Sequence, residues 1–426
     1  MTIENLYEIY LKYPSVQTDT RKLKAGDLFF GLKGPSFNGN AFARQAIESG
    51  AAFAVIDDPS CQIPDKTILV DDVLTALQQL ARHHRMQFSI PFIAITGSNG
   101  KTTTKELIHA VLSKKYKTYT TEGNLNNHIG VPLTILKIRK DAEMAIIEMG
   151  ANHLKEIASY CTIAMPTHGL ITNCGKAHLE GFGGEEGVRK GKGELFDYLR
   201  IAKGTAWVMW DYEYLREMSK GIPEIYTYGT KDAAIEGNVS VADPYLEVKF
   251  VKGYEGIIKT SLVGGYNLPN VLAAVAAGIY FSVPGQLVKE AIEAYQPTNS
   301  RSQLLQKGKS SVILDAYNAN PTSMKAAIDN FAGSAAKNKI LVLGSMAELG
   351  ESSVAEHENI IREIAKHTWR YVLLVGNNFK LVSHPYQQFE SAEEAGKWLK
   401  EQHVENASIL IKGSRSMQME KVLDYI

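Results

Sequence analysis

Short apolar runs alternate with longer amphipathic segments through most of this chain of 426 residues. A run of about four to eight apolar residues is typical of a buried strand, whereas apolar residues spaced three or four apart predict a helix. In the middle of the chain these patterns predict strands at 92–96, 144–149 and 169–172 and helices at 102–112, 154–160 and 188–199. This alternation of strand and helix indicates a doubly wound parallel sheet.

The two flanking parts of the chain also carry strand and helix patterns. Polar and apolar residues alternate over 246–251, which predicts an antiparallel flap before a helix at 268–281. Pro91 and the turn-rich stretch 297–300 mark two domain boundaries. The other strands are expected at 27–32, 51–56, 67–70, 312–314, 340–343, 371–375 and 408–411, and the other helices at 41–49, 73–86, 323–331, 356–366 and 391–402. We therefore expect an α/β protein with three domains: a small N-terminal α/β domain (1–88), a central doubly wound domain (89–298) and a C-terminal Rossmann-like domain (299–426).

Charge and cysteine content exclude several classes of function. Lysine plus arginine equals aspartate plus glutamate, at 46 each, so no overall positive field is available to hold a nucleic acid or an anionic membrane. Three widely spaced cysteines without a C-x-x-C pair suit a reducing cytoplasm. The first residues lack the positive charge of a secretory signal, and the longest apolar stretch, 271–283, falls short of the ~20 residues of a membrane span. We expect a cytoplasmic protein with no nucleic acid and no membrane insertion. A monomer is the expected state, although neutral net charge leaves the oligomeric state open.

A glycine-rich loop directly follows the predicted strand 92–96 and opens the predicted helix 102–112. Its glycines let the backbone approach a phosphate, its lysine supplies a positive charge, and a threonine hydroxyl can bind Mg²⁺. The loop is shorter than the usual P-loop template, because Ile95 stands where that template has its first glycine. The plain alternative is an ordinary strand-to-helix turn. The loop that we predict to bind a nucleotide phosphate is Gly97-Ser98-Asn99-Gly100-Lys101-Thr102-Thr103.

Two further side chains are candidates for binding a metal ion. Glu148 ends an apolar run, which would put its carboxylate at the carboxyl edge of the sheet, where ligands of open α/β sheets bind. His178 also follows a predicted strand and lies among glycines instead of on an apolar face. Each has a structural alternative: Glu148 could be a strand-end carboxylate in water, and a lone histidine usually has a structural role.

Segments in all three expected domains match one known family: 19–21, 26–30, 97–106, 124–134, 148–150, 177–183, 192–194, 315–321, 344–350 and 412–415. Together they resemble the Mur ligases of peptidoglycan synthesis. The loop is shared with folylpolyglutamate synthases, so it indicates only the superfamily. The segments 317–321 (Tyr-Asn-Ala-Asn-Pro) and 346–350 (Met-Ala-Glu-Leu-Gly) resemble the branch that adds D-alanyl-D-alanine to UDP-MurNAc-tripeptide.

The resemblance implies an ATP- and Mg²⁺-dependent ligase that forms an amide through an acyl phosphate. It implies an N-terminal domain that holds the UDP-sugar peptide, a central P-loop ATPase domain, and a C-terminal domain that receives the dipeptide. The catalytic residues it implies are Lys101, Lys192 and His178, and the metal ligands are Thr102, Glu148, His178 and Lys192. Besides the loop, the nucleotide contacts it implies are Asn267, Arg301, Asn318 and Asn320.

Lys192 and Tyr266 differ from the other candidates in what the resemblance implies for them. By the resemblance, Lys192 is a carbamylated lysine, and we expect Arg189, Lys190 and Mg²⁺ to lower the pKa of its amine from ~10.4; the plain alternative is a solvated helix lysine. The family commonly has His-Asn before its Ala-rich helix, where this chain has Tyr266-Asn267, so only the asparagine is carried over, as an adenine contact. A nucleotide contact by Tyr266 is a further option.

Three alternatives remain at this point. One is a Mur ligase of the MurE type, although the Asp-Asn-Pro-Arg segment that binds diaminopimelate there is absent. Another is a folylpolyglutamate synthase. The third, of a different class, is a nucleotide switch that hydrolyses little ATP, although a switch would not require the additional metal-ligand candidates. The third residue of the tripeptide, lysine or diaminopimelate, is left open.

Overall fold

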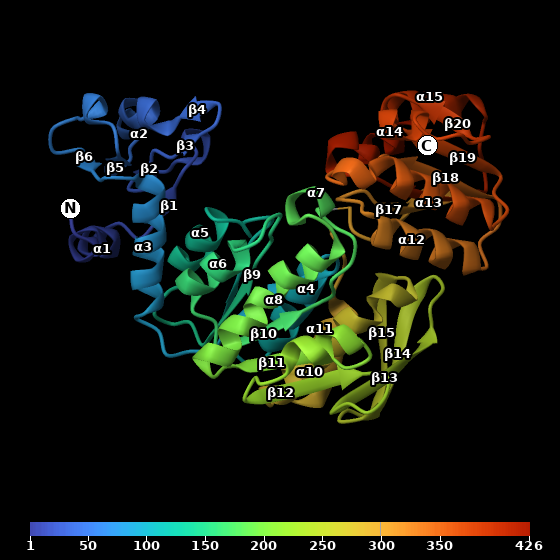
Figure 1. The fold of residues 1–426 in the computed structure, drawn as a ribbon, viewed down its shortest axis with the longest axis horizontal. Helices are drawn as coiled ribbons and strands as arrows, with labels where there is room; N and C mark the ends of the chain where they lie inside the picture. Colours follow the sequence, from blue (N-terminus) through green and yellow to red (C-terminus); the bar gives the residue numbers. More distant parts are fainter. Residues whose placement is uncertain (299) are drawn as a thin grey trace.

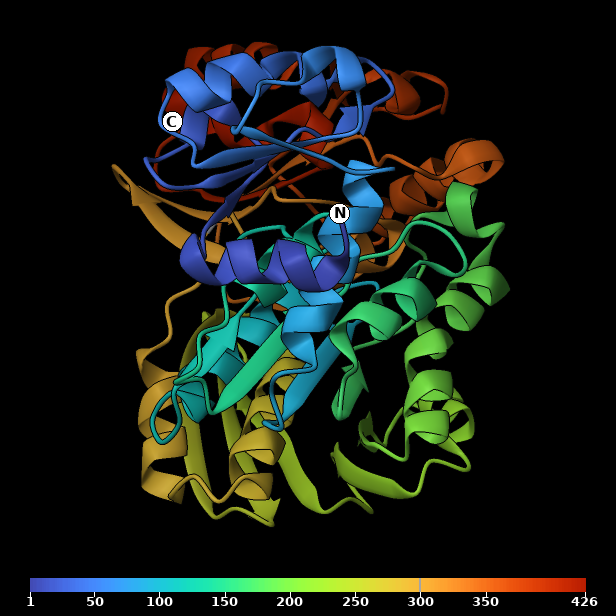
Figure 2. The same ribbon diagram turned by 90° about the vertical axis from the view of Figure 1, so that its left-hand side faces the viewer.

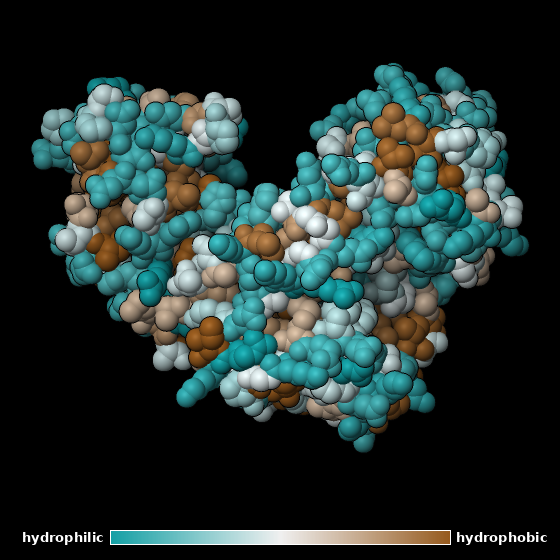
Figure 3. Space-filling model, viewed as in Figure 1, coloured by the Kyte–Doolittle hydropathy of each residue, from teal (hydrophilic) through white to brown (hydrophobic). Residues whose placement is uncertain are grey.

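The computed structural model describes residues 1–298 and 300–426, which fold into three α/β domains. The central domain lies between the other two, and the N-terminal and C-terminal domains stand on the same side of it (Figure 1). The surface is deeply hollowed between these two lobes (Figure 3). Asn299, where we predicted the C-terminal domain to begin, lies outside the described residues, and both domain limits stay predictions.

The N-terminal domain is built on a small parallel sheet with the strand order β1-β2-β5-β6. Its strands are β1 (Val16–Gln17), β2 (Leu28–Phe30), β5 (Phe53–Ile56) and β6 (Thr67–Leu69), with a separate hairpin of β3 (Lys33–Gly34) and β4 (Phe37–Asn38). Its helices are α1 (Ile3–Lys12), α2 (Ala43–Glu48) and α3 (Val73–Arg85). The strand expected over 27–32 is confirmed only over Leu28–Phe30.

Helix α3 joins the N-terminal domain to the central domain (Figure 2). It begins at Val73 because the Asp72 side chain accepts a hydrogen bond from the Thr75 N–H, at 2.7 Å. At its other end the Arg85 guanidinium is buried, donates to the carbonyl oxygens of Ala164 and Met165 at 2.8 and 2.9 Å, and stacks on a phenylalanine of the central sheet. The N-terminal domain is therefore firmly attached to the central one.

The central sheet is parallel from β8 to β13, in the order β8-β9-β7-β10-β11-β12-β13, and continues antiparallel through β14 and β15. The strands are β7 (Phe92–Thr96), β8 (Thr118–Thr120), β9 (Met144–Glu148), β10 (His168–Ile171), β11 (Thr205–Met209), β12 (Glu224–Gly229), β13 (Ile235–Val241), β14 (Tyr245–Lys252) and β15 (Gly256–Val263). The helices are α4 (Lys101–Leu112), α5 (Gly130–Leu136), α6 (Glu156–Ala164), α7 (Leu179–Phe182), α8 (Glu185–Ala202), α9 (Glu213–Ser219), α10 (Leu268–Tyr280) and α11 (Gly285–Ala294). The predicted parallel sheet and antiparallel flap are confirmed.

Two details of the central domain bear on the sequence predictions. The helix predicted at 154–160 instead runs over 156–164, because Lys155 adopts a left-handed conformation and the Glu156 carboxylate accepts the N–H groups of the preceding turn. The longest apolar stretch belongs mainly to α10, which is buried as predicted. Within the described part of the chain, no helix combines the length and the apolar character needed to cross a membrane.

The C-terminal domain has a sheet with the order β16-β17-β21-β18-β19-β20, in which only the β16–β17 pair is antiparallel. Its strands are β16 (Gln303–Lys307), β17 (Ser310–Asp315), β18 (Lys339–Gly344), β19 (Tyr371–Val375), β20 (Gln387–Phe389) and β21 (Ser408–Lys412). Its helices are α12 (Pro321–Gly333), α13 (Ser353–Ala365), α14 (Asn377–Lys380) and α15 (Ala392–Glu401). The loop that follows β17 reaches the central domain, where the candidate site lies.

Candidate active site

A cavity of about 1000 Å³ lies where the central and C-terminal domains meet. Cavities of this size hold cofactors and substrates. The central domain contributes the glycine-rich loop, the end of β9 and the segment after β10, and the C-terminal domain contributes the loops after β17 and β18. The cavity therefore brings together most of the segments that carry the sequence predictions.

The glycine-rich loop needs glycine at two positions. Gly97 has φ +142°, and a Cβ atom there would lie 2.0 Å from Thr172 Oγ1. Gly100 has φ +80° directly before α4, and its Cβ would lie 2.6 Å from Asn270 Oδ1. The bare backbone can therefore turn tightly and present its N–H groups, together with the helix N-terminus, to an anion.

Lys101 folds back over this loop. Its Nζ donates hydrogen bonds to the carbonyl oxygens of Gly97 at 2.6 Å and Ser98 at 3.4 Å. Burial lowers the pKa of the Lys101 amine; the nearby Glu148 carboxylate works against this shift and the Arg301 guanidinium adds to it. The amine is thus held at the point where a phosphate on the loop would need a positive charge.

Glu148 ends β9 beside the loop, as its position in the sequence predicted. Its Oε1 accepts hydrogen bonds from Thr102 Oγ1 at 3.2 Å and Asn126 Nδ2 at 2.8 Å. Its Oε2 is buried, accepts no hydrogen bond from the described residues, and lies 3.6 Å from Lys105 Nζ. A buried carboxylate oxygen without a hydrogen bond, next to a threonine hydroxyl, is a donor set that fits Mg²⁺.

The other two predicted metal ligands, His178 and Lys192, have polar partners other than Thr102 and Glu148. His178 Nδ1 contacts Glu348 Oε2 of the C-terminal domain at 2.5 Å. Lys192 is fully buried on α8, and its Nζ donates to the Ala151 carbonyl oxygen at 2.9 Å. Among residues 1–298 and 300–426, no three His, Cys, Asp or Glu side chains gather as a metal cluster.

The environment of Lys192 differs from the one we expected. It is not a solvated helix lysine, because its side chain has no exposed surface. Burial, with a further contribution from Lys101, lowers the pKa of its amine to about 7. Arg189 and Lys190, which we expected to help lower this pKa, are not among its main causes; loss of solvation is the largest cause.

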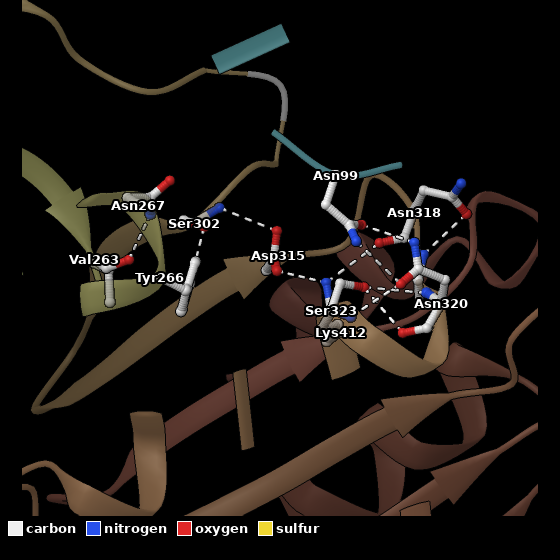
Figure 4. A network of polar contacts seen from close by, with 11 residues as sticks. Asn99, Val263, Tyr266, Asn267, Ser302, Asp315, Asn318, Asn320, Ser323 and Lys412 are labelled. Atoms are coloured by element: carbon white, nitrogen blue, oxygen red, sulfur yellow. Dashed lines mark hydrogen bonds and ion pairs between the residues drawn. The ribbon is translucent and has the colours of Figure 1, made fainter. Parts of the chain in front are cut away.

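The C-terminal domain meets the loop through two asparagines (Figure 4). Asn320 Nδ2 donates to Asn99 Oδ1 at 2.7 Å, and Asn99 Nδ2 donates to Asn320 Oδ1 at 3.4 Å. Asn320 also begins α12, since its side chain accepts the Ser323 N–H. Asn318 lines the cavity two residues earlier, with its side chain turned to the backbone of the next residue.

Arg301 and Tyr266 lie near the connection between the two domains. The Arg301 guanidinium stacks on the Tyr317 ring, with its Cζ 3.6 Å from the ring centroid, and its Nε has no hydrogen-bond partner among the described residues. The Tyr266 hydroxyl and Ser302 Oγ are 3.0 Å apart, and the Ser302 N–H donates to Asp315 Oδ1 at 3.3 Å (Figure 4). Tyr266 of the central domain is thus joined to Ser302 of the C-terminal domain.

Asn267, the predicted adenine contact, is held in place by its neighbours. It lies before α10 and donates to the Val263 carbonyl oxygen at 2.9 Å. Its Oδ1 accepts from Asn270 Nδ2, and Asn270 in turn accepts from the Thr104 hydroxyl on α4. The asparagine lines the same cavity as the loop.

The sequence predictions missed several residues of this site. Asn126 and Lys105 contact Glu148, and Glu348 contacts His178. All three stand in segments that carried the family resemblance, so membership of such a segment was the available signal. Their pairing with a particular partner depends on contacts between segments 22 or more residues apart, which no local pattern encodes.

Three family models match the chain: the Mur ligase catalytic domain over residues 12–85, the Mur ligase middle domain over 95–278, and the Mur ligase glutamate ligase domain over 300–415. Over 424 residues the chain is 36% identical to the UDP-N-acetylmuramoyl-tripeptide--D-alanyl-D-alanine ligase of Bacillus subtilis, and the match covers 96% of this chain and 92% of the relative. The chain belongs to the Mur ligase family. It is therefore an ATP-dependent ligase that forms a C–N bond.

Solved structures agree with this membership of the Mur ligase family. MurF from Acinetobacter baumannii matches with a TM-score of 0.88 at 31% identity, over 96% of this chain and 93% of that one. MurF ligase from Thermotoga maritima, in complex with ADP, matches with a TM-score of 0.86 at 25% identity, over 97% of each chain. The three-domain α/β architecture and the use of ATP, both predicted from the sequence, are confirmed.

Proposed function

We propose that this protein joins D-alanyl-D-alanine to UDP-MurNAc-tripeptide in the cytoplasmic synthesis of peptidoglycan precursors. The observation that carries the proposal is the phosphate loop, which faces a cavity whose opposite wall comes from the C-terminal domain. Such an arrangement lets a nucleotide and an acyl acceptor approach one carboxylate from two sides. The names of the relatives and of the solved MurF structures supply the two substrates.

In the proposed reaction, the terminal carboxylate of the tripeptide attacks the γ-phosphorus of ATP, and ADP leaves. The dipeptide ammonium loses a proton to the solvent, and the resulting amine attacks the acyl carbon. The C–N bond forms, phosphate departs with the electrons of the C–O bond, and the nitrogen gives up its second proton to the departing phosphate. Lys101 and Arg301 would offset the charge of the transferring phosphoryl group. Asn267 would contact the adenine, while Asn318 and Asn320 would contact the nucleotide from the C-terminal domain.

Thr102 and Glu148 would hold Mg²⁺, which supplies electrostatic stabilisation of the phosphates. His178 and a carbamylated Lys192 would serve as further metal ligands. Lys192 suits carbamylation because CO₂ reacts with a neutral amine, and burial holds the pKa of this amine at about 7. A carbamate would also replace a costly buried cation with an anion that the neighbouring Lys101 attracts.

A ligase assay tests the proposal. The protein is incubated with ATP, Mg²⁺ and UDP-MurNAc-tripeptide, carrying either lysine or diaminopimelate, together with D-alanyl-D-alanine, and phosphate release is compared with product mass. Parallel reactions contain the substrates of the two rival ligases. Turnover that requires D-alanyl-D-alanine is expected; phosphate release with only a rival set would refute the proposal. Lys101→Ala, which removes the loop amine, serves as the inactive control.

The nucleotide-switch alternative is set aside by family membership, since Mur ligases turn over ATP to make a bond. The predicted monomeric state stays a prediction.

A further inference from the structure

The cavity is lined by several carboxylates besides the one beside the phosphate loop. Glu156 accepts two backbone N–H groups, and Asp211 accepts one with both of its oxygens. Asp315 contacts a lysine amine and a backbone N–H. Glu148 already has threonine, asparagine and lysine partners. Each of these four is therefore held by protein donors and serves the local structure or the metal.

Glu348 differs from these four. Its Oε2 contacts His178, whereas its Oε1 has no partner among the described residues. About half of its side chain is exposed, and it lines the cavity from the C-terminal side. The loop that carries it is anchored on either side by the buried side chains of Met346 and Leu349, and its own carbonyl oxygen accepts the Glu180 N–H at 3.3 Å.

This placement suits a cation and opposes a phosphate. The cavity already offers Lys101 and Arg301 to the phosphate groups, whereas a carboxylate repels a phosphate and attracts a cation. The proposed reaction brings one cationic organic group into the cavity, the ammonium of the incoming dipeptide. A carboxylate pairs with an ammonium through short, charge-assisted hydrogen bonds.

Resting on the proposed function, we propose that Glu348 binds the ammonium group of D-alanyl-D-alanine. Its position on the C-terminal domain means that the dipeptide nitrogen is carried toward the acyl phosphate by the same domain that completes the cavity. Its carboxylate lies against His178, at the boundary between the two domains. The free Oε1 is the atom that would accept the N–H of the substrate.

The test is Glu348→Gln, which keeps the shape of the side chain and removes its charge. We expect the KM for D-alanyl-D-alanine to rise roughly 10- to 100-fold, the range for losing a hydrogen bond to a charged group. The KM for ATP and the Mg²⁺ concentration for half-maximal rate should stay within about twofold. Propionyl-D-alanine, which has the shape of the dipeptide without its amine, should inhibit the wild type and the variant with the same Ki.

Glu351→Gln is the matched control, because it removes the same charge from an exposed residue of the same loop that does not line the cavity. It should behave as the wild type. An unchanged dipeptide KM in Glu348→Gln, or a shift in the Mg²⁺ requirement in its place, overturns the assignment and indicates that Glu348 acts only on His178. If the wild type does not ligate the dipeptide, the proposed function is wrong and this inference is wrong with it. If the wild type ligates the dipeptide and the variant has an unchanged KM, only this inference is wrong.

Discussion

Replacing Lys192 with methionine should abolish ligation and yet change stability in a pH-dependent way. The pKa of the buried amine is about 7, compared with ~10.4 for an exposed lysine. Between these two values the unfolded chain binds more protons than the folded one, so the free energy of unfolding of the wild type rises with pH across that window. Below pH 7 both states are protonated and the full cost of burying the charge is present.

The size of this effect follows from the two pKa values. The penalty that Lys192 imposes on folding is about 4 kcal/mol at pH 7.5 and about 1 kcal/mol at pH 9.5, since one pKa unit corresponds to ~1.4 kcal/mol. Methionine removes the penalty but leaves the Ala151 carbonyl oxygen without its donor, which subtracts an amount independent of pH. The diagnostic quantity is therefore the change with pH. The stability advantage of the methionine variant should shrink by roughly 2–3 kcal/mol from pH 7.5 to 9.5.

Chemical denaturation of both proteins in CO₂-free buffer at these two pH values measures this difference. The ligase assay should show turnover reduced at least ~100-fold in the variant, and added bicarbonate should not restore it. In the wild type, activity should fall as the pH drops through 7, because the amine becomes protonated and can no longer react with CO₂. A difference in stability that does not change with pH, or a variant with near-normal turnover, would refute the reasoning.

Three further predictions concern contacts around the loop. Glu148→Gln should raise the Mg²⁺ concentration for half-maximal rate by at least ~10-fold, because it removes the carboxylate charge, as a Mg²⁺ titration of the ligase rate would show. Tyr266→Phe should lower the free energy of unfolding by about 1 kcal/mol, because it removes the hydrogen bond to Ser302. Ser302→Ala removes the same bond and should have the same effect. In denaturant unfolding, the double variant should be no less stable than either single variant. Asn320→Asp keeps the helix cap but loses the hydrogen bond that Asn320 donates to Asn99. The free energy of unfolding, measured by thermal unfolding, should change by less than about 1 kcal/mol, whereas the KM for ATP should rise several-fold. An unaltered KM would show that the cross-domain bond does not shape the nucleotide site.

The sequence was most informative where a local pattern determines the structure. The apolar strand 92–96, the two glycines of the loop and the helix that follows could be predicted together, because each is set by neighbouring residues. The position of Glu148 at the sheet edge was also predicted correctly. The last residue of a buried strand lies at the edge of the sheet whatever surrounds the sheet. The architecture followed from the alternation of strand and helix.

The partners of the site residues could not be predicted from such patterns. The low pKa of Lys192 arises from its burial against segments that follow β9 and from Lys101, not from the adjacent cations in its own helix. The engagement of His178 by Glu348 joins residues of different domains. Both depend on how the domains pack, and the spacing of residues along one helix or strand does not determine that packing.

The contact between the central and C-terminal domains combines two kinds of interaction with different responses to salt. The Asn99–Asn320 pair joins two neutral amides, whereas Lys176 meets Glu356 at 2.7 Å as an ion pair. Dissolved ions screen partly exposed charges but leave neutral amides almost untouched. As ionic strength rises, the ion pair should weaken first while the amide pair persists. Backbone hydrogen bonds from Gly265 to Asn330 and from Ala335 to Asp243 also cross this contact, so the two domains would stay together.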